Sequence, residues 1–147
     1  MIVKKVEEWM TKFNRPFNTD SSKKLQAAFE MFKEEYEELC EAIARNDEIE
    51  IMDGIADLLW TVIQYSFTKG YNPTDLIDAV YESNMSKLIT DKEQGELEVS
   101  KYNLNNPEVE QVFLEYDNDK GYGYLKRIRD GKIRKTSTFK EPKFITP

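Results

Sequence analysis

The sequence predicts an all-α protein, a four-helix bundle followed by a less regular C-terminal appendage. Three observations lead to this prediction. Apolar residues recur at three- and four-residue steps in the first 88 positions, which is the spacing of one face of an α-helix. The links between the second, third and fourth predicted helices are short, so these helices should pack as neighbours. Later in the chain the apolar residues alternate with polar ones, which is typical of strands.

The first two predicted helices are amphipathic. The first covers residues 3–13 and ends at the turn "NRPFN". The second starts at a cap supplied by Asp20 or Ser21 and closes at "ARND". Its apolar positions are Leu25, Phe29, Phe32, Tyr36, Leu39 and Ile43.

The third and fourth predicted helices have clear boundary signals. The third covers residues 48–69, with Asp47 as its cap and Gly70 in the usual stop position. The fourth covers residues 74–88 and follows Asn72, a good capping residue. Most positions from 51 to 67 are apolar, so we expect the third helix to be buried on most sides.

The appendage covers residues 89–147. It begins with a polar link, "TDKEQGE", and continues with an alternating stretch that predicts a small β-ribbon. Within it, "RDGK" is typical of a hairpin turn. We therefore expect a helical domain at residues 1–88 and a basic extension at 89–147, packed on the same domain or on a sister subunit.

Composition excludes several kinds of chemistry. The chain has no histidine, which rules out His-based triads, His-ligated zinc and the Glu-x-x-His pairs of di-iron bundles. Cys40 is the only cysteine, so no disulfide forms within the chain, and a reducing cytoplasm is the expected location. No apolar run reaches the length of a membrane span, and none resembles a signal peptide, so we expect no membrane partner.

Charge is unevenly distributed along the chain. The net charge is −7, yet the segment from Lys120 onward contains nine Lys or Arg residues and only two acids. The basic tail either neutralises its own body or a sister subunit, or meets an anionic ligand. The acidic body argues against binding a nucleic-acid polymer.

A polar stripe runs along the otherwise apolar third helix. Helical spacing places four of its polar residues within about 80° of one another: Asp53, Asp57, Thr61 and Gln64. Glu50 extends the stripe by one turn. Glycine at position 54 costs helix stability, and would let another backbone or a ligand approach closely.

The acids of the second helix fall on two sides. Glu35 and Glu38 lie beside the apolar face, whereas Glu34 and its remaining neighbours point to solvent. Four carboxylates, from Glu35, Glu38, Asp53 and Asp57, would repel one another without a cation, and a hard divalent ion such as Mg²⁺ removes that repulsion. Two alternatives are a solvated acidic face, and an Asp53–Asp57 pair that binds Lys or Arg.

These motifs resemble the all-α nucleoside triphosphate pyrophosphohydrolases, the superfamily of MazG, the dimeric dUTPases, the dCTP pyrophosphatases and phosphoribosyl-ATP pyrophosphohydrolase. The hallmark Glu-Glu-x-x-Glu helix is similar to "EEYEELCEAI", and the acidic motif ending in Asp-Leu-Leu is similar to "DGIADLLW". The segments "ESNMSKL" and "RDGKIRK…F..P" resemble phage and bacterial MazG-like members.

One departure affects the metal ligands. The common second motif is Glu-x-x-Asp, but the position three before Asp57 is Gly54. Asp53 lies one residue earlier, and Glu50 with Asp53 forms a literal Glu-x-x-Asp one turn upstream. The stripe favours Asp53 with Asp57, and Glu50 stays an alternative for the fourth ligand.

The resemblance implies Mg²⁺-dependent hydrolysis of a nucleoside triphosphate to a monophosphate and pyrophosphate, with Mn²⁺ as a possible substitute. Glu38 or Glu34 would orient or deprotonate the attacking water, and Asn84 and Lys87 would bind the substrate. Lys87 has an alternative role as a helix C-terminal cation. The resemblance also implies a homodimer or homotetramer. Phosphoribosyl-ATP or another nucleotide as substrate, or a non-catalytic helical interaction module, are the other functions to consider.

Overall fold

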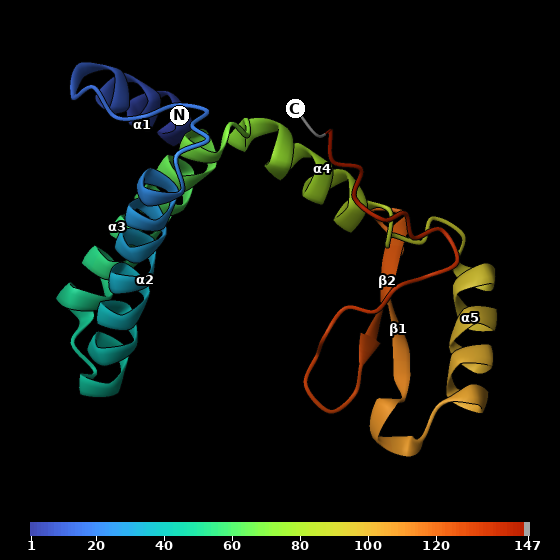
Figure 1. Ribbon diagram of the computed structural model, residues 1–147. Coiled ribbons are helices and arrows are strands. Elements are labelled where there is room, and N and C mark those ends of the chain that lie inside the picture. The colour runs from blue at the N-terminus through green and yellow to red at the C-terminus, as the bar shows by residue number, and fades with distance from the viewer. Residues whose placement is uncertain (146–147) are drawn as a thin grey trace. The chain divides into compact units, whose positions relative to one another are not determined.

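The computed structural model describes residues 1–145, which form two compact units. One unit contains Met1–Ile77 and the other Asp78–Phe144, so the boundary falls within the fourth helix (Figure 1). The division predicted at residue 88 rests on composition rather than on contacts, and it lies later in the chain. Each unit is described by itself below.

The first unit is built on a pair of long helices (Figure 1). α2 (Ser22–Arg45) and α3 (Glu48–Lys69) pack along one another, joined by a tight turn in which Asn46 has a left-handed φ of 55°. The shorter helix α1 (Ile2–Lys12) packs on α3 and buries Val6 and Met10 completely. Trp9 of α1 meets Trp60 of α3 edge to face, with 5.8 Å between ring centroids.

The predicted caps of these helices are confirmed. Ser21 begins α2 by accepting a hydrogen bond from the backbone N–H of Lys24, and Asp47 begins α3 by accepting one from Glu50. Gly70 ends α3 with a φ of +88°, a conformation that glycine adopts without strain.

The burial expected for α3 is wrong within a single chain. The side of α3 that faces the other helices is buried, but its large apolar side chains on the opposite side are between 41% and 73% exposed: Ile49, Met52, Ile55, Leu59 and Val62. α2 adds further exposed apolar residues at seven-residue steps, namely Phe29, Tyr36 and Ile43. The hydrophobic pattern alone predicted burial, whereas α1 and α2 cover only one side of α3.

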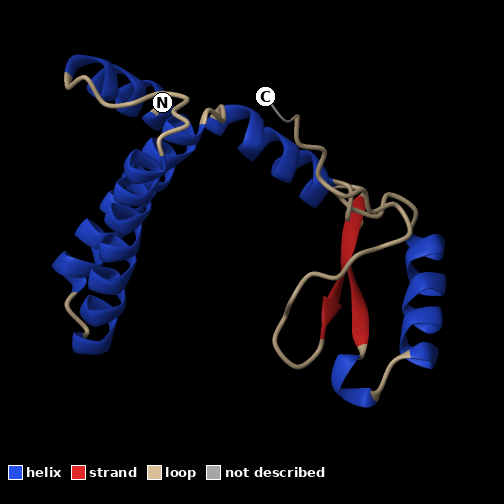
Figure 2. Ribbon diagram, in the orientation of Figure 1, coloured by secondary structure: helices blue, strands red, loops and turns tan. Residues whose placement is uncertain are grey.

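The second unit combines helices with a β-hairpin (Figure 2). The later residues of α4 (Pro73–Met85) lead into it, and α5 (Lys92–Asn105) follows. A 3₁₀ turn (Glu108–Glu110) then precedes the strands β1 (Val112–Asp117) and β2 (Tyr122–Arg127), which pair antiparallel. The predicted hairpin is therefore confirmed.

Helix α5 corrects the prediction of a polar link at residues 90–96. Asp91 caps it by accepting a hydrogen bond from the backbone N–H of Gln94. The helix covers one face of the hairpin, where Ile89, Val112 and Leu125 form the buried core. Gly95 allows this contact because a Cβ there would lie 2.9 Å from a methyl carbon of Leu114. Tertiary packing thus stabilises a helix whose own apolar periodicity is weak.

The "RDGK" segment forms a turn, as predicted, but it follows β2 instead of joining the two strands. Its Gly131 has a φ of +72°, and the turn returns Ile133 to pair with Lys126. Helices dominate the described residues, with one small hairpin, and the all-α class is confirmed. Within residues 1–145 none of the helices has both the length and the apolar character that crossing a bilayer requires.

Candidate functional site

The predicted carboxylates lie beside a close contact between α2 and α3. A Cβ built on Gly54 would lie 3.1 Å from the Leu39 Cβ and 3.2 Å from its Cα. A side chain at this position would be tight, and Leu39 would have to shift by a few tenths of an ångström to admit it. Leu39 directly follows Glu38, and Gly54 directly follows Asp53, so the contact brings the two acidic motifs to the same level of the helix pair.

Glu35 is the carboxylate most affected by this arrangement. Its side chain is half-buried, and burial raises its pKa above the ordinary value of 4.5. Further increases in the pKa come from four neighbouring negative charges, in descending order those of Asp57, Glu38, Glu34 and Asp53. The other four acids that the sequence predicted for the metal and catalytic roles thus lie near enough for their charges to act on Glu35.

No cation balances this acidic cluster within residues 1–145. The ion pairs of the first unit join other residues, such as Glu8 to Lys12 and Glu37 to Lys33. Apart from Glu35, the acids of the cluster are exposed. In the part of the chain that the structure describes, the alternative of an Asp53–Asp57 pair bound to Lys or Arg finds no supporting contact.

The donor set suits a hard divalent cation. All candidate ligands are carboxylate oxygens, which Mg²⁺ prefers, and after burial their negative charges are the second cause of the raised pKa of Glu35. As the side chains stand, no three acidic groups among residues 1–145 converge closely enough to hold an ion. Four of the five are exposed side chains that are free to change rotamer, so the predicted ligand set of Glu35, Glu38, Asp53 and Asp57 stays a prediction.

The same stripe of α3 continues into a buried polar region. Thr61 and Gln64 are 5% and 3% exposed, respectively. The Thr61 hydroxyl donates back to the Asp57 carbonyl, 2.9 Å away, whereas the Gln64 Oε1 has no hydrogen-bond partner. The predicted stripe is therefore real, but its acidic end is exposed and its uncharged end is buried against α2, where the Gln64 amide nitrogen lies 4.0 Å from the Met31 sulfur.

The predicted substrate-binding residues lie in the second unit, at the end of α4. Lys87 Nζ donates a 2.7 Å hydrogen bond to Asn84 Oδ1 and lies 5.8 Å from the centre of the Phe139 ring. Lys135 approaches the same ring to 4.2 Å. The sequence did not indicate that Lys135 and Phe139 are neighbours of Lys87, although both belong to the segment "RDGKIRK…F..P". No local signal connects that segment with α4.

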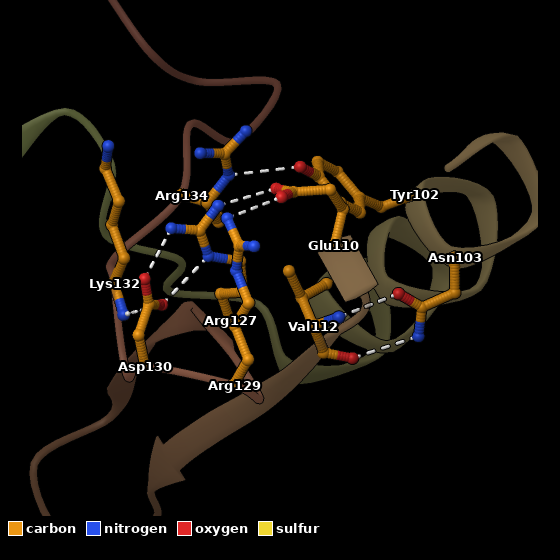
Figure 3. A network of polar contacts seen from close by, with 9 residues as sticks. All are labelled: Tyr102, Asn103, Glu110, Val112, Arg127, Arg129, Asp130, Lys132 and Arg134. Carbon is orange, nitrogen blue, oxygen red and sulfur yellow. Dashed lines mark hydrogen bonds and ion pairs between the residues drawn. The ribbon is translucent and has the colours of Figure 1, made fainter. Parts of the chain in front are cut away.

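The basic tail is largely balanced by acids of its own unit (Figure 3). Arg127, only 7% exposed, donates to Glu110 at 2.7 Å and to Asp130 at 2.5 and 2.8 Å. Arg129 also contacts Glu110, at 2.8 Å. Lys126 pairs with Glu115 across the hairpin.

This network shifts the pKa values of its acids in the opposite direction from that of Glu35. The hydrogen bonds from Arg127 hold the pKa of Asp130 far below its usual range, and they also lower the pKa of Glu110. The structure therefore indicates that Lys126, Arg127 and Arg129 neutralise acids of the same chain. This is the first of the two roles considered for the basic tail, and binding of an anionic ligand is the second.

Comparison with known proteins gives one match. The family model described as phosphoribosyl-ATP pyrophosphohydrolase matches residues 3–84, which is more than half of the chain. This range contains the acidic cluster and Asn84, and it ends before Lys87. No curated protein and no solved structure matches the chain.

Proposed function

Because the chain belongs to the phosphoribosyl-ATP pyrophosphohydrolase family of MazG-like pyrophosphohydrolases, we propose that it hydrolyses the bond between the α- and β-phosphates of a nucleotide and releases pyrophosphate. The observation that supports this proposal is the cluster of five acids around Glu35, without a balancing cation among the described residues. A nucleoside triphosphate is the expected substrate. The matched family model favours phosphoribosyl-ATP as the second candidate, which contains the same triphosphate chain.

In this proposal, acids of α2 and α3 bind the metal ion together. Glu35, Glu38, Asp53 and Asp57 would hold Mg²⁺, or Mn²⁺ in its place. Such an ion, when bound, neutralises phosphate charge and lowers the pKa of water. Asp53 is favoured over Glu50 as the fourth ligand, because the negative charge of Asp53 acts on Glu35.

Glu34 and Glu38 are the candidates for orienting the attacking water or accepting its proton. Both lie on α2 beside Glu35, both are exposed, and both raise the pKa of Glu35 by their charges. With no histidine in the chain, a carboxylate is the available general base near this site. Asn84 and Lys87 would bind the phosphates or the sugar.

A homodimer or homotetramer is part of the same proposal. The exposed apolar side chains of α3, from Ile49 to Val62, form one stripe on the helix that also carries Asp53 and Asp57, and α2 adds a second row. Large apolar patches on a soluble protein mark interaction sites. A second copy of the chain would bury the stripe and place the active site near the subunit contact. A cytoplasmic location stays a prediction from the lone Cys40.

The catalytic proposal is tested by incubating the protein with a panel of dNTPs, NTPs and phosphoribosyl-ATP, with and without Mg²⁺. We expect pyrophosphate release only with the metal, and a loss of at least about 100-fold in kcat/KM for Asp57→Asn. Glu37→Gln is the matched control, because Glu37 lies on α2 but pairs with Lys33. Release of inorganic phosphate instead would contradict the cleavage position, and no turnover of any nucleotide would leave the interaction module as the better interpretation.

The subunit contact is tested by light scattering. We expect the wild-type chain to be a dimer or tetramer, and Leu59→Glu to shift it toward the monomer, because a carboxylate would be buried in the apolar contact. Lys69→Glu, at an exposed polar position of the same helix, should leave the oligomer intact. A monomeric wild-type protein at micromolar concentration would contradict the proposal.

A further inference from the structure

The basic tail is fixed to the end of α4 by a short segment, residues 136–140. Ser83 donates a 2.8 Å hydrogen bond to the Lys140 carbonyl, and the Lys140 N–H donates one of the same length to the Ser86 hydroxyl. The Thr138 hydroxyl donates to the Ser86 carbonyl at 2.7 Å. These bonds join residues more than 50 positions apart, so they hold the segment at one defined place on the second unit.

The attached segment places the Phe139 ring beside two lysines. Lys87 Nζ lies 5.8 Å from the ring centre and Lys135 Nζ lies 4.2 Å from it, both within the range of a cation–π contact. Because these distances add to about 10 Å, the two ammonium groups can lie no farther apart than that. Two lysine ammonium groups thus lie near one aromatic ring.

These two charges are weakly balanced within the described residues. The polar partner of Lys87 is the neutral amide of Asn84. Lys135 pairs with Glu141 at 2.8 Å, but the two side chains are 63% and 73% exposed, and ion pairs at such exposure contribute little. By contrast, Arg127 is held by two acids in a buried position.

We propose that Lys87, Lys135 and Asn84 form a phosphate-binding site of the second unit, with Phe139 as the platform that positions both lysines. The ligand class is a condensed phosphate, either free pyrophosphate or the phosphate chain of a nucleotide. The inference rests on the proposed function only for the source of that phosphate. It assigns Lys135 as a further substrate-binding residue. Arg127 is excluded, because two acids hold it in a buried position.

Binding of inorganic pyrophosphate to the full-length protein tests this site by calorimetry, in a metal-free buffer that contains a chelator. Lys87→Gln and Lys135→Gln should each weaken binding by roughly tenfold, because each removes one charge-assisted contact to phosphate. Lys132→Gln is the matched control: Lys132 is exposed and lies in the same tail, and its replacement changes the net charge equally. It should leave the affinity unchanged.

The platform is tested by Phe139→Leu. This change keeps the backbone and hydroxyl contacts of the segment but removes the ring, and should weaken pyrophosphate binding about threefold or more. Circular dichroism of each variant checks that the fold is retained.

Several outcomes would overturn the inference. They are the absence of metal-free pyrophosphate binding by the wild type, equal losses in Lys132→Gln and Lys135→Gln, and unchanged affinity in both Lys87→Gln and Lys135→Gln. The proposed hydrolysis is measured separately. Pyrophosphate binding that depends on Lys135, without turnover of any nucleotide, would support this site and reject the activity. Turnover that is unchanged in Lys135→Gln would support the activity and reject this site.

Discussion

In the first unit the acids of the cluster at Glu35 have no ion-pair partner among the described residues, whereas in the second unit the acids of the network in Figure 3 face arginines. Glu35 shows the effect in the first unit, where burial and its acidic neighbours raise its pKa. Asp130 shows the opposite effect in the second unit, where its hydrogen bonds with Arg127 lower its pKa. The two units therefore use the same kind of side chain with opposite electrostatic consequences.

The difference separates a candidate site from a structural network. Balanced charges, as around Arg127, hold a turn and a hairpin together and leave little capacity to bind anything else. Unbalanced charges cost stability, and such groups are concentrated at functional sites. The proposed metal chemistry therefore belongs to the first unit, and the Arg127 network contributes stability to the second. Substitutions test each assignment.

The largest expected effect on stability comes from Arg127→Met. Removing this buried guanidinium leaves Glu110 and Asp130 without their main partner, and breaking a buried pair from one side is strongly destabilising. Hydrogen exchange should show the hairpin and α5 losing protection. Tryptophan fluorescence should change little, because Trp9 and Trp60, the only two tryptophans, both lie in the first unit.

Arg129→Met is the matched control for this loss. Arg129 contacts the same Glu110, but its side chain is 52% exposed, so its removal should have a much smaller effect. Equal losses of protection in the two variants would contradict the view that burial of Arg127 makes the network structural.

Asp130→Asn should give a smaller effect that depends on pH. Because the native pKa of Asp130 lies below its ordinary value of 3.8, its ionised form stabilises the folded state above that pH. The stability difference between wild type and variant should be full at neutral pH, and should decline as the pH falls below about 3.8. Denaturant titrations across this range, followed by hydrogen exchange in the second unit, measure it. A difference that grows on acidification would refute the proposed pairing.

The smallest expected change has the opposite sign. Glu35 has a raised pKa, so its ionised form disfavours folding once the pH exceeds that native pKa. Glu35→Gln should therefore make the first unit more stable than the wild type at neutral pH. The advantage should disappear as the pH falls to the ordinary value of 4.5. Urea unfolding followed by tryptophan fluorescence measures it, with Glu37→Gln as the control on the same helix.

Saturating Mg²⁺ sharpens this comparison. If Glu35 is a ligand, the metal should stabilise the wild type by mass action and Glu35→Gln much less, so that the order of stability reverses. A variant that is less stable than the wild type without metal would instead indicate that Glu35 has an ordinary structural role.

The sequence allowed the local features of the fold to be predicted, because their signals are local. Ser21, Asp47 and Gly70 are where helix caps and stops were expected. The hairpin was found from its alternation and the "RDGK" turn from its residues. Helix α5 was missed because few apolar residues mark its buried side, although Asp91 supplies a normal cap.

Only part of the candidate site could be predicted from the sequence. Helical periodicity placed Asp53, Asp57, Thr61 and Gln64 on one stripe, and the Glu-Glu-x-x-Glu motif singled out Glu35 and Glu38. Periodicity could not show which part of the stripe is exposed. That depends on how far α1 and α2 cover α3, and a single chain leaves the apolar residues around Leu59 open.

By itself, then, the sequence determined the first four helices, the caps of α2 and α3, the hairpin and the residues of the two acidic motifs, because local periodicity, sterics and hydrogen bonds set these features. Only the tertiary structure decided which charges meet. The contact of Gly54 with Leu39 brings the acids to Glu35, and the attachment of residues 136–140 brings Lys135 and Phe139 to Lys87. These contacts join distant positions in the chain, and their energies depend on distance and burial, which no local pattern encodes.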